Sequence, residues 1–276
     1  MALAFFKRAL ALVRGGGDLA SGVIYRLHRA GFPVIVTELE KPLLVRRTVS
    51  YGTAVFSGEI TVQGVTAKHV ASLSEAATIL AQDMIAVIVD PQGESIVALK
   101  PAILVDSRVA KTNIDTIIDD APLVIALGPG FNAGVDCHAV IETNRGHNLG
   151  RVIWHGYAEP DSGVPASIGG ISHSRLLRAP TDGFVEALAE IGAALDVGAQ
   201  IARVGGQTVS APFAGVLRGL IHEGVLVTAN MKIGDLDPRA QRENCFTISD
   251  KSLAIGGGVL EAVFSALQIR PYLTTG

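Results

Sequence analysis

The chain has 276 residues, of which 49% are hydrophobic and 18% charged, and its formal net charge is −3. This length allows two domains of ordinary size, and the apolar content allows a sizeable core. The charge balance offers neither the basic patch of a nucleic-acid-binding protein nor a polybasic membrane anchor. Aromatic residues, at 5%, are too few for base-stacking platforms. Nucleic-acid and membrane partners are therefore not expected.

Cysteine usage and the apolar runs predict the compartment. No run approaches the roughly 20 apolar residues of a spanning helix. The apolar start, residues 1–13, is interrupted by Lys7 and Arg8, and it is predicted to lead into a first strand rather than to be a signal peptide. The two cysteines, Cys137 and Cys245, form no CxxC motif, which suits a reducing cytoplasm. A cytoplasmic location is expected.

A glycine-rich loop follows the first predicted strand, residues 10–13, and precedes helical spacing over residues 23–30. A second apolar strand, residues 32–37, then ends at Glu38. Strand, glycine loop, helix and strand in this order form the dinucleotide-binding pattern, in which the loop and the helix amino terminus hold a phosphate. The loop residues are Gly15, Gly16, Gly17, Asp18 and Leu19.

Three residues fit the G-x-G-x-x-A spacing of that pattern, namely Gly15, Gly17 and Ala20. Glu38 lies where a ribose-binding acid is expected, which would favour NAD over NADP. Asp18 departs from the pattern because its charge would repel a phosphate, and it is predicted instead to cap the helix. Two interpretations stay open: a site for a nucleotide or another phosphate, and a turn whose glycines only allow close packing of helix on sheet.

Further buried strands are predicted at residues 85–89, 103–105 and 123–127. Strands that alternate with helices predict an α/β fold, here a Rossmann-like domain with a mostly parallel sheet. Ligands of such sheets bind outside the carboxyl ends of the strands. The residues expected at that edge are Glu38, Asp90, Asp106, Gly128 and Gly130.

Residues 136–147 are dense in reactive side chains. On a strand, His138 and Glu142 share one face and are expected to point at one ligand, and Arg145 and His147 follow in a turn. An arginine there fits a phosphate or a carboxylate. Structural hydrogen bonding and an anionic-ligand site are the leading interpretations of the cluster.

Two other interpretations of the same cluster have less support. A metal site from His138, Glu142 and His147 has suitable ligand types, but the spacing is not diagnostic, so no metal is expected. Cys137 could act as a sulfur-handling nucleophile beside His138. Adjacent residues on a strand face opposite ways, however, so the histidine is poorly placed to activate it.

A gapless internal repeat runs through residues 178–236. Ala179-Pro180 is matched by Ala211-Pro212, 32 residues later, and Gly192 is matched by Gly224 at the same offset. Such a repeat predicts two copies of one supersecondary unit over a shared apolar face. Short apolar runs bounded by Gly, Pro and Asp predict strands. The pattern resembles the barrel-sandwich hybrid of biotinyl and lipoyl domains.

In those domains the carrier lysine stands on the hairpin that joins the two copies. The corresponding joint here, residues 204–209, has no lysine, and Lys232 lies late in the second copy. The repeat is therefore expected to be a docking or lid domain and not a carrier.

The chain closes with a second glycine-rich stretch, residues 255–258, and a helix predicted over residues 259–267. The stretch is expected either to hold an anion at the helix amino terminus or to pack the last helix on the first domain. The predicted division is a Rossmann-like ligand-binding domain at 1–172, a repeat domain at 173–250, and a carboxyl-terminal helix at 251–276 that returns to the first domain.

Short motifs along the chain are VRGGGDLA from Val13, TELEKP from Thr37, VRRTV from Val45, GPGF from Gly128, HAVIET from His138, RGH from Arg145 and KIGD from Lys232. Their combination resembles the YqeB-type selenium-dependent molybdenum hydroxylase system proteins over nearly the whole chain. The resemblance implies an accessory role beside such hydroxylases, in the maturation of their cofactor. It implies no set of catalytic residues.

The leading hypothesis is a cytoplasmic accessory protein that binds a nucleotide or molybdopterin at Gly15 to Asp18 and at Gly128 to Gly130. The repeat domain would cover this site or dock the client hydroxylase. The side chains expected at the reactive end of the ligand are His138, Glu142, Arg145 and His147.

Two alternatives belong to other classes of protein. One is an oxidoreductase that uses NAD or NADP, with Glu38 on the ribose. The other is a scaffold with an empty glycine loop. The sequence leaves open whether a reaction is catalysed, whether sulfur or selenium is handled, and whether the chain forms a homo-oligomer.

Overall fold

The computed structural model describes residues 5–161 and 175–274. They form two compact units. The first, here called the α/β unit, comprises Met1–Pro42, Tyr51–Asp161 and Ile248–Gly276. The second, here called the β unit, comprises Leu43–Ser50 and Ser162–Thr247. The short segment Leu43–Ser50 thus belongs with the repeat, which the sequence did not indicate.

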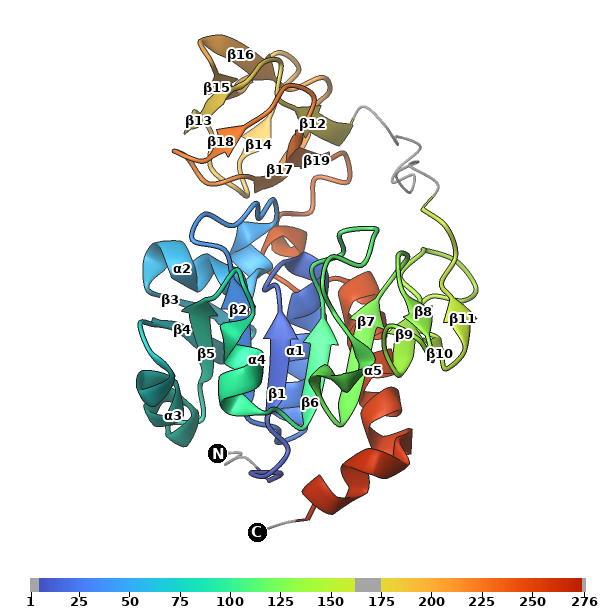
Figure 1. Cartoon of the computed structure of the whole chain (residues 1–276). Helices are drawn as coiled ribbons and strands as arrows, with labels where there is room; N and C mark the ends of the chain where they lie inside the picture. Colours follow the sequence, from blue (N-terminus) through green and yellow to red (C-terminus); the bar gives the residue numbers. More distant parts are fainter. Residues whose placement is uncertain (1–4, 162–174, 275–276) are drawn as a thin grey trace. The chain divides into compact units, whose positions relative to one another are not determined.

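A nine-stranded sheet forms the centre of the α/β unit, in the order β10-β9-β7-β6-β1-β2-β5-β4-β3 (Figure 1). Neighbouring strands from β9 to β4 are parallel, and only β10 and β3 at the two edges are antiparallel to their neighbours. The mostly parallel α/β sheet predicted from the sequence is confirmed. The strands are β1 (Ala11–Arg14), β2 (Val34–Glu38), β3 (Glu59–Val62), β4 (Val65–Val70), β5 (Ile85–Val89), β6 (Ile103–Asp106), β7 (Leu123–Leu127), β9 (Ala139–Ile141) and β10 (Val152–Ile153).

The central strands are apolar on both faces because helices cover both. Every residue of β1, β2 and β7 is buried, as expected for a parallel sheet between two helical layers. The strand order reverses at β1, since β2 lies on one side of it and β6 on the other. The carboxyl ends of β1 and β6 therefore form the switch point, the part of the sheet edge at which open α/β sheets bind ligands.

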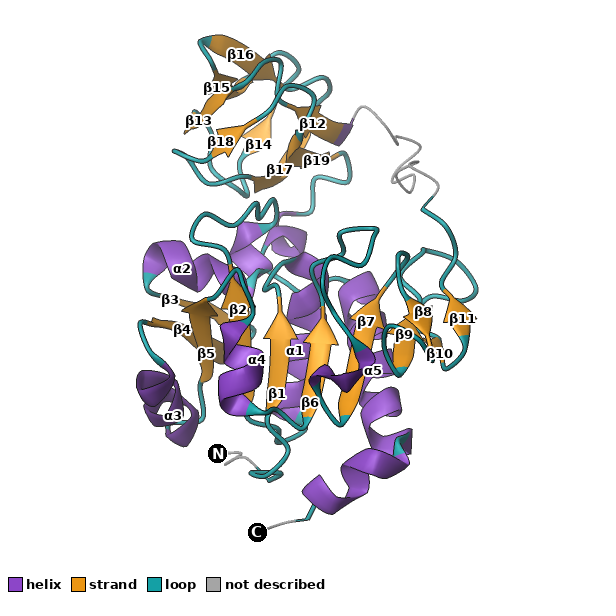
Figure 2. Ribbon diagram, viewed as in Figure 1, coloured by secondary structure: helices purple, strands orange, loops and turns teal. Residues whose placement is uncertain are grey.

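The helices are α1 (Asp18–Arg29), α2 (Ala54–Ser57), α3 (Leu73–Ala81), α4 (Glu94–Leu99) and α5 (Asp250–Ser265). In Figure 2, α1 and α5 lie on one face of the sheet and α4 lies on the other. Single turns of 3-10 helix occur at Arg47–Val49, Tyr51–Thr53, Ile118–Asp120 and Arg242–Cys245, and a longer one at Leu267–Tyr272. Strands β8 (Asn132–Ala133) and β11 (Gly156–Tyr157) pair with each other.

The last helix decides between the two expectations for residues 255–258, in favour of packing on the first domain, and it begins earlier than predicted. It begins at Asp250, with Ser249 as N-cap, so the glycines at 256–258 lie inside the helix and do not form an anion-binding loop. A Cβ at Gly256 would overlap the carbonyl group of Gly22 in α1, and a Cβ at Gly22 would overlap that of Ser252. Gly22 and Gly256 therefore allow the close packing of α5 on α1.

The start of α1 corrects a second prediction. The N-cap is Gly17, in extended conformation, and Asp18 is the first helical residue. Asp18 therefore does not cap the helix, although its charge lies in the first turn, where the helix dipole favours an acid. The hydroxyl of Ser252 donates to the carbonyl oxygen of Asp18 at 2.9 Å, which ties α5 to this turn.

The β unit consists of two four-stranded antiparallel sheets, β12-β19-β17-β14 and β16-β15-β13-β18. The first copy of the repeat supplies β12 to β15, and the second supplies β16 to β19. Each sheet thus holds two strands of each copy, and exchanging the copies converts one sheet into the other. The strands are β12 (Leu176–Arg178), β13 (Gly183–Ala187), β14 (Ala194–Leu195), β15 (Gln200–Val204), β16 (Gln207–Ser210), β17 (Gly215–Leu220), β18 (Leu226–Val227) and β19 (Lys232–Asp237).

The hairpin that joins the two copies turns at Gly205 and Gly206, whose φ angles are 55° and 81°. A two-residue turn with positive φ at both positions matches the twist of antiparallel strands. Its tip carries no side chain at all, so the position of a carrier lysine is empty of any group that could be modified. Lys232 lies instead at the start of β19.

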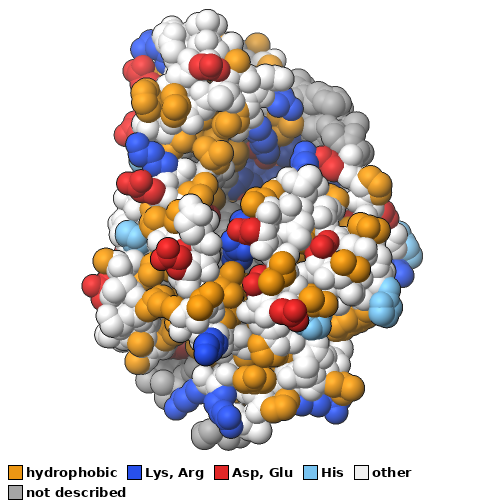
Figure 3. Space-filling view, viewed as in Figure 1, with side chains coloured by type: hydrophobic (Ala, Val, Ile, Leu, Met, Phe, Trp, Pro, Cys, Tyr) orange, Lys and Arg blue, Asp and Glu red, His pale blue; other side chains and the backbone are white. Residues whose placement is uncertain are grey.

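No helix in the described part of the chain is both long and apolar enough to cross a membrane. On the face drawn in Figure 3, acidic, basic and hydrophobic side chains are interspersed.

Candidate functional site

The glycine loop lies at the carboxyl end of β1, as predicted. Gly15 has a φ of 90°, which favours glycine, and its N–H donates to the carbonyl oxygen of Thr37 at 2.8 Å. Gly16 is covered, because a Cβ there would lie 2.6 Å from the nitrogen of Gly52. Gly17 is the N-cap of α1, and the first N–H groups of a helix have no partner within the helix. Of the three glycines, Gly17 is therefore the one suited to a phosphate.

Glu38 lies beside this loop at the end of β2. One carboxylate oxygen accepts from the N–H of Gly16 at 2.8 Å, and the other accepts from the N–H of Leu39 at 2.9 Å. Burial raises the pKa of Glu38, and these two hydrogen bonds oppose the rise. A Cβ at Gly52 would lie 2.8 Å from the Glu38 carboxylate. The geometry thus favours a role in fixing the loop over the predicted contact with a ribose.

A charged network fills the switch point, and the sequence did not single it out. The Arg14 guanidinium donates to both oxygens of Asp115, at 2.7 and 3.0 Å. Arg108 donates to both oxygens of Asp106, at 3.2 and 2.6 Å, and also to Asp115 at 2.7 Å. The hydroxyl of Thr116 donates to Asp106 at 2.7 Å. The segment after β6 therefore folds back over the carboxyl ends of β1 and β6.

These arginines lower the pKa of Asp115 to about 2, chiefly through the hydrogen bond from Arg14. Asp115 is accordingly a carboxylate at any physiological pH. Asp106 was expected at this edge, but Arg14 and Asp115 were not. The one available signal was an arginine that ends a fully buried strand directly before the glycine loop.

The turn that contains Gly128 and Gly130 follows β7, as predicted. A Cβ at Gly128 would lie 2.5 Å from the Thr143 hydroxyl, and a Cβ at Gly130 would lie 2.5 Å from the backbone of Lys111. Neighbouring segments therefore occupy the space above both glycines. Close packing explains these residues without a ligand.

His138 and Glu142 are not brought together. The imidazole Nδ1 of His138 accepts from the N–H of Val124, at the start of β7, and burial lowers the pKa of this histidine. Glu142 lies beyond the other end of β9, where its two oxygens accept from the N–H groups of Asn144 at 2.6 Å and Glu159 at 2.7 Å. Four residues of extended chain separate them by about 13 Å. The expectation of one shared ligand is therefore wrong.

The remaining side chains of residues 136–147 do not form a ligand site either. Arg145 forms a bidentate ion pair with Asp250, with N–O distances of 2.7 and 2.8 Å. His147 is exposed in the turn that follows. Within the described residues, no group of three or more His, Cys, Asp or Glu side chains could hold a metal ion. Cys137 is buried, and burial raises its pKa to about 12, so it lacks the thiolate that a nucleophile needs.

Lys251, in the first turn of α5, was not identified from the sequence. Partial burial lowers its pKa, and the nearby charge of Arg145 lowers it further, whereas Asp18 and Glu142 oppose this. The neighbour of Lys251, Ser252, donates to the carbonyl oxygen of Asp18, so the first turn of α5 lies against the first turn of α1. The lysine adds a cation to the edge at which Gly17 lies.

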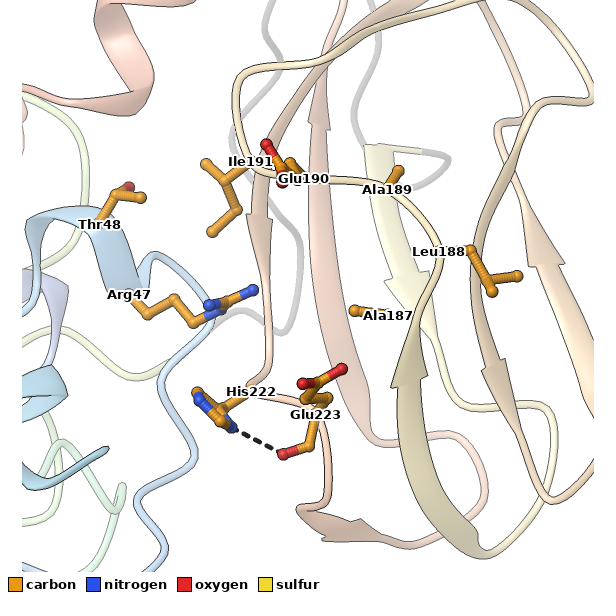
Figure 4. A pocket seen from close by; sticks show the side chains of 9 residues that line it. All are labelled: Arg47, Thr48, Ala187, Leu188, Ala189, Glu190, Ile191, His222 and Glu223. Atoms are coloured by element: carbon orange, nitrogen blue, oxygen red, sulfur yellow. Dashed lines mark hydrogen bonds between the residues drawn. The ribbon is translucent and has the colours of Figure 1, made fainter. Parts of the chain in front are cut away.

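The β unit has a pocket of about 550 Å³, shown in Figure 4. Its apolar wall includes Leu188 and Ile191, and the side chain of Arg47 points into it. Arg47 donates to the carbonyl oxygen of Leu220 at 2.8 Å, and burial lowers its pKa while the charge of Glu223 opposes the shift. Sequence reasoning missed this pocket because Arg47 comes from a segment far from the repeat. The full lining is Arg47, Thr48, Ala187, Leu188, Ala189, Glu190, Ile191, His222 and Glu223.

The fold and the loop define an α/β protein with a covered switch point, joined to a β unit built from an internal repeat. No family model matches the chain. It is 48% identical, over 94% of its length, to the protein of Escherichia coli K12 called "Uncharacterized protein YqeB". The chain is therefore similar to YqeB, as its motifs indicated. It spans about half the length of this relative, covering 48% of it.

Two solved structures show weak similarity. An aspartoacylase family protein from Mesorhizobium loti is 12% identical, with a TM-score of 0.29, over 84% of this chain and 86% of that one. The product-bound ectoine utilization protein EutE (DoeB) from Ruegeria pomeroyi is 12% identical, with a TM-score of 0.23, over 83% of this chain and 57% of that one. At these TM-scores neither structure supports an argument about fold or function.

Proposed function

We propose that the α/β unit binds a small ligand with a phosphate group, either a nucleotide or a phosphate-bearing pterin cofactor such as molybdopterin. The observation that carries this proposal is the position of Gly17. It ends the glycine loop after β1, caps α1, and lies at the sheet edge where the strand order reverses. A helix amino terminus at a switch point is a favourable site for a phosphate in a Rossmann-like domain.

The biological role that we propose is accessory. The chain would assist selenium-dependent molybdenum hydroxylases in the maturation or insertion of their molybdenum cofactor, inside the cytoplasm. This assignment rests on the family resemblance of the motifs, with which the similarity to YqeB agrees. The carboxyl-edge residues Gly17 and Lys251 would hold the phosphate end of the ligand.

The oxidoreductase alternative has less support. It requires Glu38 to bind the ribose of NAD, but both Glu38 oxygens accept backbone hydrogen bonds and Gly52 lies against them. A ribose would have to displace Gly52 and its hydrogen bond to the carbonyl oxygen of Gly16.

We further infer that the β unit is a barrel-sandwich hybrid, because each of its sheets takes two strands from each copy of the repeat. With glycines at the hairpin tip, it would dock the client hydroxylase and carry no covalent cofactor. The accessory role and the ligand site are tested together in cells.

Replacement of Gly17 by valine is expected to lower hydroxylase activity in the native host by about tenfold or more. The extended backbone of Gly17 accepts a β-branched residue, so the side chain should block the ligand without backbone strain. Gly257→Ala, on the open side of α5, is the control and should leave activity unchanged. Full hydroxylase activity with Gly17→Val, at normal levels of both proteins, would leave only the scaffold hypothesis.

A further inference from the structure

The segment that covers the switch point places one carboxylate between two guanidinium groups. Asp115 accepts from Arg14 with both oxygens and from Arg108 with one of them. We propose that Arg14 and Arg108 form a binding site for a terminal phosphate, and that Asp115 occupies this site until the ligand replaces it. The inference rests on the proposed function in one respect, because the phosphate would belong to the same ligand.

The geometry of the two arginines suits a phosphate. Donors of Arg14 and Arg108 converge at 2.7 Å on a single oxygen of Asp115, and Arg14 adds a second donor at 3.0 Å. A phosphate presents three oxygens and up to two charges, so it can use this set of donors more fully than a carboxylate does. Arginine forks are the groups that proteins prefer for such recognition.

The charges explain why the site needs an occupant. The Arg14 side chain is only 4% exposed, and a buried guanidinium without an anion is costly. Asp106, which is buried, stays paired with Arg108. Departure of Asp115 would therefore leave one uncompensated positive charge at the switch point, which an anionic ligand would neutralise.

Asp115 is the acid of the network that can leave the arginines. Asp115 is 42% exposed, in contrast to the other acid of the network, Asp106, at 1%. Val109 and Lys111, which precede Asp115 in the same segment, have φ angles of 52° and 67°. Positive φ is unfavourable for a β-branched residue, and such strain is typical of ligand clamps and switch segments. Release of the segment from Arg14 would allow this strain to relax.

Ser107 links the network to β1 through its backbone. The Oγ of Ser107 is buried and has no hydrogen-bond partner among the described residues, although buried hydroxyls are normally paired. Ser107 lies directly between Asp106 and Arg108 in the chain, and its N–H donates to the carbonyl oxygen of Arg14 at 2.9 Å. This hydrogen bond ties the segment after β6 to the end of β1.

The site also adjoins the glycine loop. A Cβ at Gly15 would lie 3.4 Å from the Cα of Arg108, so the loop and Arg108 are in direct contact. A ligand held at Gly17 would need to extend only along the loop to reach the arginines. The two sites would then bind one molecule with two anionic parts, such as a diphosphate.

The test is calorimetric titration of the full chain with inorganic phosphate and with pyrophosphate. Asp115→Asn removes the carboxylate that competes with phosphate for the two arginines. In the wild type only those molecules in which Asp115 has left the arginines can bind, which lowers the apparent affinity. We therefore expect the variant to bind phosphate at least about tenfold more tightly than the wild type. Asp119→Asn makes the same change of charge at an exposed acid nearby and should bind like the wild type. Equal affinity in all three proteins would overturn the proposal.

A second variant ties the effect to the arginines. Arg108→Lys in the Asp115→Asn protein keeps the positive charge but loses the guanidinium, which can donate two parallel hydrogen bonds. This change should cancel most of the gain in phosphate affinity. Circular dichroism must show that each variant is folded, and Arg14→Lys replaces Arg108→Lys if the latter is not. A gain that survives loss of the fork would place the phosphate elsewhere and overturn the site.

The two proposals can fail separately. If Asp115→Asn gains phosphate affinity but the chain binds neither nucleotide nor pterin, the arginine site stands and the proposed function fails. If a nucleotide or pterin binds the wild type and Asp115→Asn changes nothing, the proposed function stands and the arginine site fails.

Discussion

Gly256→Ala is expected to destabilise the α/β unit by about 1–3 kcal/mol, whereas the same change at the next residue should stabilise it. A Cβ at Gly256 would overlap the backbone of Gly22, so α5 would have to move away from α1. The higher helix propensity of alanine offsets only about 1 kcal/mol of this cost. Urea denaturation followed by circular dichroism measures the free energy of unfolding.

Gly257 provides the matched control. It lies in the same helix and nothing lies within 4 Å of its Cβ position. Gly257→Ala should therefore add about 0.5–1 kcal/mol of stability through helix propensity alone. Stabilisation by both substitutions would mean that α5 does not pack on α1 through its glycines.

Asp235→Ala is expected to cost about 3–5 kcal/mol, the largest single effect in the β unit, because it removes one partner of a buried charge network. Asp235 is 2% exposed. It accepts from Arg175 at 2.9 Å, and the Arg218 guanidinium lies 3.8 Å away. Its loss would leave buried guanidinium charge poorly compensated. Thermal and urea unfolding of the full chain, monitored by a probe in the β unit, measure the loss.

An exposed ion pair in the same unit is the control. Arg203 and Glu186 lie 3.1 Å apart with both side chains open to solvent. Glu186→Ala should change stability by less than about 1 kcal/mol, because solvent and salt screen such pairs. If Asp235→Ala costs no more than Glu186→Ala, the buried network does not stabilise the β unit.

The sequence predicted those elements whose signal is local. Strands such as β5 and β7 are continuous apolar runs between turn residues, and their place in a parallel sheet follows from the alternation with helices. The repeat was visible because its offset of 32 residues holds without a gap. That offset also matches the strands, since β13 and β17 begin at Gly183 and Gly215.

Predictions failed where a residue has its role through a distant partner. The glycines at 256–258 were taken for a loop because glycine weakens helices, yet the helix includes them, and Gly256 allows close packing on α1. The period of a strand placed His138 and Glu142 on one face, but it does not show that each end of β9 meets a different neighbour. Arg14 and Asp115 pair across about a hundred residues, which no local pattern reveals.

Calorimetric titration of the full chain with nucleotides and with molybdopterin tests the central claim, that the glycine loop binds a phosphate-bearing ligand at the switch point. We expect one of these ligands to bind with a stoichiometry of one per chain, and Gly17→Val to abolish the binding while Gly257→Ala retains it. Absence of binding by the wild type, or equal binding by Gly17→Val and the wild type, would contradict the claim.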